Sequence, residues 1–177
     1  PTDTWGKNFI TVPQKSRNFV IYRIVKSDPS AIVKVNGTVV TYNPNSIYYD
    51  FVSQQVDQIS SDKPIQVVQY AVTQSETISC GSDTSDVGDP EMIYLNPLEQ
   101  TLTKITMYST DRYLILSHFI NVVVKNGGVG SFVVDGVSVS SSFSPVPGNN
   151  EYSYAQLSVS QGTHNLSSEL GFNAIAY

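Results

Sequence analysis

Four carboxylates stand close together near the middle of the chain, in a stretch rich in Ser, Thr and Asp. They are Asp83, Asp86, Asp89 and Glu91. Calcium takes six to eight oxygen ligands, and loop carboxylates spaced two or three residues apart can supply several of them. The spacing does not fit an EF-hand loop, which ends on a bidentate Glu. The cluster is therefore the candidate metal site, for a structural Ca²⁺, with a solvated acidic loop as the alternative. No other cofactor is expected.

Five aromatic residues are the candidates for direct contact with a ligand. They are Trp5, Tyr48, Tyr49, Tyr152 and Tyr154. Flat rings with a polar tip can stack on a sugar or anchor a protein partner, although a core tyrosine with its hydroxyl at the rim is the alternative. Because successive residues of a strand point to opposite faces, we expect one of Tyr48 and Tyr49 to face outward.

Catalytic chemistry has little support in the sequence. A nucleophile elbow of the Gly-x-Ser-x-Gly type is absent, and 15 acidic residues are too many for the sequence to place one catalytic pair. His118 and His164 fall at strand positions, where we expect structural roles. The single cysteine, Cys80, excludes an internal disulfide and a cysteine-based zinc site. No catalytic residue is assigned.

Composition narrows the class of partner. The net charge is −5, and the ten Lys and Arg residues are scattered, so the clustered positive face that nucleic acids need is missing. No apolar run approaches the ~20 residues that span a bilayer. Only 14% of residues are charged, and the polar surface of Ser, Thr, Asn and Gln is typical of extracellular β modules. The chain opens on Pro1 without a Met, which indicates a segment of a longer protein.

The elements that must position these residues occur twice. Arg23 to Val40 aligns without a gap on Val122 to Val139, at an offset of 99 residues. Gln58 to Tyr70 aligns on Asn165 to Tyr177 at an offset of 107, so the second copy carries about eight extra residues between the blocks. An internal repeat of this kind predicts two copies of one structural unit.

Short runs rich in Val, Ile, Tyr, Phe and Thr between turn residues predict strands throughout. In the first copy they are 8–12, 19–25, 31–35, 38–42, 48–51, 54–59 and 65–72; in the second they are 93–95, 105–108, 118–124, 130–134, 137–140, 153–159, 164–166 and 172–177. Asn36-Gly37 and Asp135-Gly136 predict two-residue type I′ hairpin turns. The runs Val67-Val68 and Val122 to Val124 favour strands buried on both faces.

The fold expected from these patterns is all-β, with two tandem, homologous, antiparallel units of the β-sandwich or jelly-roll type. We place the first repeat at 1–74, an acidic linker loop and entry strand at 75–100, and the second repeat at 101–177.

Several short motifs in order carry a family resemblance. They include Trp5-Gly6, Asn36-Gly37, the stretch Asp62 to Tyr70, and the stretch Gly88 to Gln100. Together with His164 to Tyr177, they resemble the IgGFc-binding protein N-terminal domain family in its bacterial form, over nearly the whole chain. The resemblance implies an extracellular or outer-surface, non-catalytic, adhesion-like module. The single Cys80 departs from the cysteine-rich animal members of that family.

The sequence thus favours a non-enzymatic binding or adhesion module of a secreted or cell-surface protein, with a host or environmental protein or glycan as its ligand. A carbohydrate-binding module attached to a hydrolase is the alternative, and a glycan-active enzyme is the weakest one.

Overall fold

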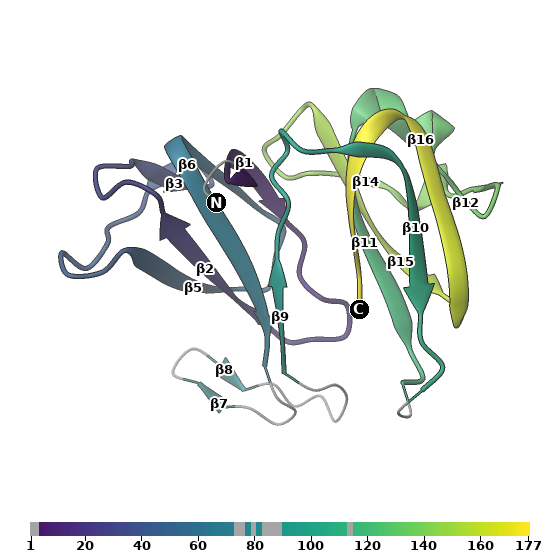
Figure 1. Ribbon diagram of the computed structural model, residues 1–177, viewed down its shortest axis with the longest axis horizontal. Coiled ribbons are helices and arrows are strands. Elements are labelled where there is room, and N and C mark those ends of the chain that lie inside the picture. The colour runs from purple at the N-terminus through teal and green to yellow at the C-terminus, as the bar shows by residue number, and fades with distance from the viewer. Residues whose placement is uncertain (1–3, 73–76, 79–80, 83–89, 113–114) are drawn as a thin grey trace. The chain divides into compact units, whose positions relative to one another are not determined.

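The computed structural model describes residues 4–72, 77–78, 81–82, 90–112 and 115–177. The chain divides into two compact units, Pro1–Gln100 and Thr101–Tyr177. Each unit is built on a curled antiparallel sheet (Figure 1). The helices of the described residues are short 3-10 turns, and none has the length and hydropathy of a membrane span. The expected all-β fold with two sandwich-type units is confirmed.

The sheet of the first unit is organised around one long strand, β6 (Asp57–Ala71). The other strands are β1 (Gly6–Thr11), β2 (Val20–Lys26), β3 (Val33–Val35), β4 (Thr38–Val39), β5 (Tyr48–Ser53) and β9 (Glu91–Tyr94). The order is β4-β3-β6-β2-β5. The first half of β6 pairs mainly with β1 and β3, and its second half pairs with β2 and β9. A separate small hairpin is formed by β7 (Thr77–Ile78) and β8 (Gly81–Ser82).

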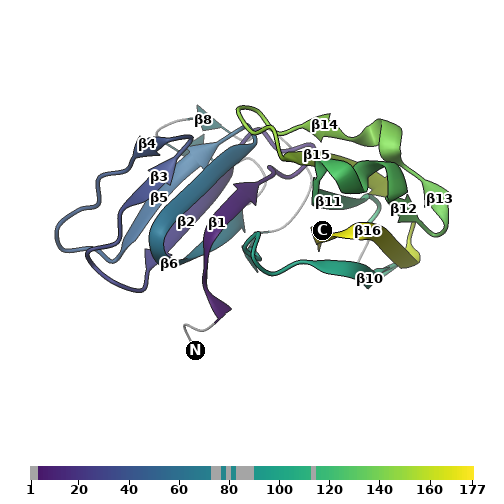
Figure 2. The ribbon, with the colours of Figure 1, turned by 90° about the horizontal axis from the view of Figure 1, so that it is seen from above.

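The sheet of the second unit has the same plan around β16 (Gly162–Ala176). Its other strands are β10 (Leu102–Ser109), β11 (His118–Lys125), β12 (Val133–Val134), β13 (Val137–Ser138), β14 (Ser144–Pro145) and β15 (Tyr152–Val159). The order is β13-β12-β16-β11-β15-β14, and β10 also pairs with β16. Figure 2 shows β10 and β16 running side by side. Two 3-10 turns, η2 (Asn126–Ser131) and η3 (Ser140–Ser142), join the strands.

Six strands of each sheet correspond in order and pairing, which confirms the internal duplication, while β9 is found only in the first sheet and β14 only in the second. The offset of 107 between β6 and β16 also holds in the pairing register. Val35 pairs with Ile59 in the first unit, and Val134 pairs with Leu166 in the second. Both hairpin turns have positive φ at both central residues, as a type I′ turn requires: Asn36 and Gly37 at 50° and 81°, and Asp135 and Gly136 at 53° and 80°.

The gap-free alignment of Arg23 to Val40 on Val122 to Val139 is wrong by one residue in its first strand. Ile24 pairs with Val67 of β6. The residue of β16 that corresponds to Val67 is Ala174, and it pairs with Val122. The strands β2 and β11 are therefore related by an offset of 98. An offset of 99 would make Val123 the counterpart of Ile24. Val123 points to the other face of its sheet, because side chains alternate with period two. The additional residue lies between β11 and β12, in the connection that contains η2.

Three other strand predictions differ from the structure. The predicted breaks at residues 60–64 and 167–171 do not occur, because β6 and β16 each continue through them and exchange pairing partners there. The first two residues of the strand predicted at 130–134 belong to η2, and the paired strand β12 is limited to Val133–Val134. The strand predicted at 93–95 for the second copy is β9, which pairs with β6 of the first unit.

Each unit has its own apolar core. In the second unit the fully buried residues include Ile120, Val122, Phe132 and Phe172. The rings of Phe132 and Phe172 meet edge to face with centroids 4.8 Å apart. The apolar runs predicted to be buried on both faces are buried: Val67 and Val68 are 0% and 4% exposed, and Val122 to Val124 are 0% to 7% exposed. One face of each sheet packs on its core, so the other face is the one that a ligand can contact.

Candidate ligand-binding face

The adjacent tyrosines Tyr48 and Tyr49 point to opposite faces of β5. Tyr49 pairs with the fully buried Ile24, and its ring packs against Tyr42 and Phe51 with centroids 5.7 Å and 6.2 Å apart. Tyr48 lies on the outer face and is 44% exposed. The predicted division between the two is confirmed, so Tyr48 is the member of the pair that a ligand can reach.

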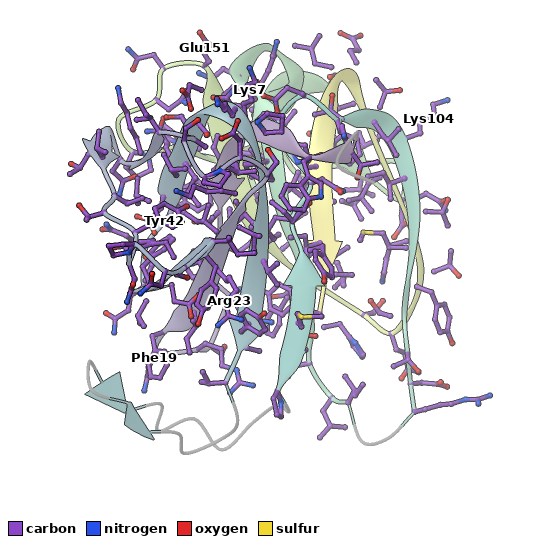
Figure 3. The ribbon with its side chains drawn as sticks, turned by 60° about the vertical axis from the view of Figure 1, so that its left-hand side comes forward. Lys7, Phe19, Arg23, Tyr42, Lys104 and Glu151 are labelled. Atoms are coloured by element: carbon purple, nitrogen blue, oxygen red, sulfur yellow. The ribbon has the colours of Figure 1, made fainter. Side chains whose placement is uncertain are left out.

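Arg23 lies at the centre of the outer face, on the neighbouring strand β2 (Figure 3). Its Nε and Nη2 atoms donate to the two carboxylate oxygens of Asp50, at 2.8 Å and 2.7 Å. The guanidinium lies 4.2 Å from the ring centroid of Tyr48 and 5.6 Å from that of Tyr70. The hydrogen bond to Asp50 raises the pKa of Arg23, so the cation is permanent. A bidentate pair of this kind fixes the orientation of the guanidinium plane.

Strand β9 extends this outer face with two exposed side chains. Tyr94 pairs with Val68, and Met92 pairs with Tyr70, so both lie on the same face as Arg23. They are 62% and 52% exposed. We call the set Arg23, Tyr48, Tyr70, Met92 and Tyr94 the aromatic face. Tyr, Arg and Met are the residue types enriched in the cores of protein–protein interfaces.

The second unit carries an uncharged version of the same arrangement. The register places Tyr154, Asn121 and Tyr177 where the first unit has Tyr48, Arg23 and Tyr70. The Tyr177 hydroxyl donates to Asn121 Oδ1 at 3.0 Å, and Asn121 is only 4% exposed. Tyr152 and Tyr154 are both half-buried. The tyrosines are thus shared by the two units, and the charged Arg23–Asp50 pair distinguishes the first.

Trp5, the fifth aromatic candidate, does not join the aromatic face. It is half-buried and directly precedes β1, and no ring contact joins it to another aromatic residue in the described part of the chain. The next residue, Gly6, is packed so closely that an added Cβ would lie 2.1 Å from the Cβ of Pro97. This close approach assigns the Trp5-Gly6 motif to the packing of β1.

The predicted metal site is only partly within the described residues. Asp83, Asp86 and Asp89 lie outside them. Glu91 begins β9 and accepts a hydrogen bond from the side-chain amide of Gln14. Desolvation raises the pKa of Glu91, and the Gln14 hydrogen bond and the charge of Arg17 oppose this effect. Among the residues that the structure describes, no three His, Cys, Asp or Glu side chains are grouped to hold an ion. Calcium binding therefore stays a prediction.

Five residues of this site are not among the candidates predicted from the sequence: Arg23, Asp50, Tyr70, Met92 and Tyr94. Arg23 and Asp50 are 27 positions apart, and only the pairing of β2 with β5 brings them opposite each other. Arg23 begins the repeated segment, but nothing close to it in the sequence indicates a charged partner. An alternation count on the two predicted strands would have placed Arg23 on the outward face with Tyr48, because Ile24 and Tyr49 are the inward residues.

Comparison with known proteins gives one match. The protein-family model described as IgGFc binding protein matches residues 1–177, the whole chain. No curated protein and no solved structure matches the chain. A model that matches from the first residue to the last covers both units and the aromatic face together. The chain therefore belongs to the IgGFc-binding protein family.

Proposed function

We propose that this chain is a non-enzymatic binding module that recognises a protein ligand through the aromatic face, and that the Fc region of IgG is the first ligand to test. The family description supports a protein ligand. The observation that carries the choice of face is the pair Arg23 and Asp50, held in bidentate geometry among exposed tyrosines. We also propose an extracellular or cell-surface location, which agrees with the charge-poor surface.

Physical properties of the aromatic face favour a protein over a sugar. Tyrosine and arginine are enriched among interface hot spots, whose truncation costs ~2 kcal/mol or more. The Asp50 carboxylate already orders Arg23, so less side-chain entropy is lost on binding. A sugar platform needs free ring faces, whereas one face of Tyr48 is covered by the Arg23 guanidinium at 4.2 Å. We therefore keep the carbohydrate-binding module as the second candidate.

The test is surface plasmon resonance with the whole chain immobilised and Fc, Fab and deglycosylated Fc as separate analytes. The informative variant is Tyr94→Ala, because Tyr94 is 62% exposed on the aromatic face. Tyr108→Ala is the matched control, since Tyr108 is 63% exposed on β10 of the second unit. We expect Tyr94→Ala to raise the Kd for Fc about 30-fold, as for the loss of a hot spot, and Tyr108→Ala to leave it unchanged.

Three other outcomes would change the proposed binding site or ligand. Equal weakening by Tyr94→Ala and Tyr108→Ala would move the binding site away from the aromatic face. Absence of Fc binding together with a positive glycan array would replace the protein ligand by a carbohydrate. Loss of the signal on deglycosylated Fc alone would show that the Fc glycan is the part recognised.

A further inference from the structure

In each unit a side chain of the hairpin turn is hydrogen-bonded to the long central strand. The turn residue is an amide in the first unit and a carboxylate in the second. In the first unit Asn36 Oδ1 accepts the backbone N–H of Gln58 at 2.9 Å, and Asn36 Nδ2 donates to the carboxylate of Asp57 at 2.7 Å. The turn residue is the amide, and the strand residue is the acid. The geometry ties the β3–β4 hairpin to the start of β6.

The second unit repeats both contacts at the equivalent positions, with different side chains. Asp135 Oδ1 accepts the backbone N–H of Asn165 at 2.7 Å, and Asp135 Oδ2 lies 2.8 Å from His164 Nδ1. Asp135 and His164 stand where the first unit has Asn36 and Asp57. Here the turn residue is the acid, and the strand residue is a histidine. Duplication has kept the contact and exchanged the side chains.

Both ring nitrogens of His164 face oxygen atoms. Nδ1 meets the Asp135 carboxylate, and Nε2 lies 2.7 Å from the backbone carbonyl oxygen of Ser160. Neither a carboxylate nor a carbonyl carries a proton to donate, so each nitrogen must supply its own N–H. A neutral imidazole has only one N–H. The two contacts are therefore complete only when His164 is an imidazolium.

Among the described residues, Asp135 is the charged group that acts on His164. The residue is 6% exposed, and the uncharged Met107 pairs with it across from β10. In the described part of the chain Asp135 is its ion-pair partner, and Ser160 supplies the other polar contact. The Asp135 carboxylate, followed by the Ser160 carbonyl, raises the pKa of His164 against the opposing effect of burial. The Asn165 N–H and then His164 lower the pKa of Asp135.

From this geometry we infer that His164 is a protonation-controlled latch, which fastens the β12–β13 hairpin to β16 as an imidazolium and releases one of its two contacts when neutral. The first unit holds the same hairpin without a histidine. The latch does not depend on the ligand of the aromatic face. It gives the second unit a response to pH that the equivalent hairpin of the first unit lacks.

Hydrogen exchange on the whole chain tests the latch, with the first unit as an internal control. The Asp135 amide donates to Asn165 O at 2.8 Å, and the equivalent Asn36 amide donates to Gln58 O at the same distance. We expect the protection factor of Asp135 relative to that of Asn36 to fall about tenfold between pH 5.5 and 8.5, as one charge-assisted hydrogen bond is lost. In the same range the imidazole ¹⁵N shifts of His164 should change from a doubly protonated to a singly protonated ring.

The matched variant transplants the chemistry of the first unit. In His164→Asp combined with Asp135→Asn, the ratio of the two protection factors should become independent of pH. A constant ratio in the unmodified chain, or a singly protonated His164 at pH 5.5, would overturn the inference. These two measurements need no variant, so they decide the question even where the double substitution prevents folding.

Discussion

Arg23 distinguishes the outer face of the first unit from the equivalent face of the second. The two units place tyrosines at the same outer positions, yet only the first has a cation between them. The side chains of Arg23 and Asp50 are 36% and 37% exposed, so solvent screens the ion pair. Exposed ion pairs are worth ~0–1 kcal/mol. The value of the pair for this protein therefore lies in the orientation of the guanidinium more than in the stability of the fold.

The substitution Asp50→Asn separates these two effects. We expect it to change the free energy of unfolding by less than about 1 kcal/mol, because the pair is exposed. The Kd for the ligand of the aromatic face should rise about tenfold, since Arg23 loses the acceptors that hold it. Chemical denaturation and surface plasmon resonance measure the two quantities. Asp28→Asn is the control, because Asp28 forms a comparably exposed pair with Lys63.

At the scale of elements, the two type I′ turns explain why the hairpins form where the sequence predicts them. Gly37 and Gly136 have φ of 81° and 80°, and an added Cβ would meet no atom within 4 Å at either position. The requirement for glycine there is one of backbone conformation and not of space. This separates the turns from Gly6, where the neighbouring Pro97 fills the position of a side chain.

Gly37→Ala should therefore destabilise the first unit by ~1 kcal/mol through backbone strain alone. Gly130→Ala is the matched control, because Gly130 also has open space around it but does not have a positive φ. Thermal or denaturant unfolding gives both values. Equal effects of the two substitutions would contradict the assignment of strain to the turn.

The acidic segment before β9 is the second element with a testable role. The sequence predicts a calcium site from Asp83, Asp86, Asp89 and Glu91. If these carboxylates bind Ca²⁺ in the folded state only, millimolar Ca²⁺ should raise the melting temperature, and EDTA should reverse the rise. Mg²⁺ at the same concentration is the control, because it prefers fewer ligands in octahedral geometry. An unchanged melting temperature would remove the metal site.

At the scale of the whole molecule, the sequence predicted what local patterns determine. The repeat, the Asn-Gly and Asp-Gly turns and the apolar strands all follow from residues close together in the chain. The features that the sequence did not predict depend on the pairing of strands that are distant in the chain. The one-residue slip between β2 and β11, the continuity of β6, and the contacts of Arg23 and His164 each depend on register, which flips a side chain to the other face when it moves by one.

The stability of the whole chain should depend on pH through the second unit. The pKa of His164 is raised above its ordinary value of 6.5, so its contribution is complete below that value and is lost as the pH rises through the raised pKa. The pKa of Asp135 is lowered from 3.8, so its contribution is present above that value and is lost as the pH falls through the lowered pKa. Both contributions are complete between about pH 4 and 6.5.

Calorimetry of the unmodified chain should show a melting temperature that falls as the pH rises from 6.5 to 8.5. The double variant His164→Asp with Asp135→Asn should show a smaller fall, and the difference isolates the latch from the other titrating groups. Parallel curves for the two proteins would assign the pH dependence to groups elsewhere in the chain.

The long strands β6 and β16 hold their register while the connections around them have changed length. Relative to the first unit, the offset grows from 99 at the hairpin β12–β13 to 106 at β15, so the added residues lie in the segment 139–151. The insertion adds β14, which pairs with β15, and leaves the pairing partners of the strands that both units share unchanged. The exposed turn at Pro147 and Gly148 is therefore the place in this segment to graft a foreign peptide, such as an epitope or an affinity tag, because it spares β14 and the buried Val146.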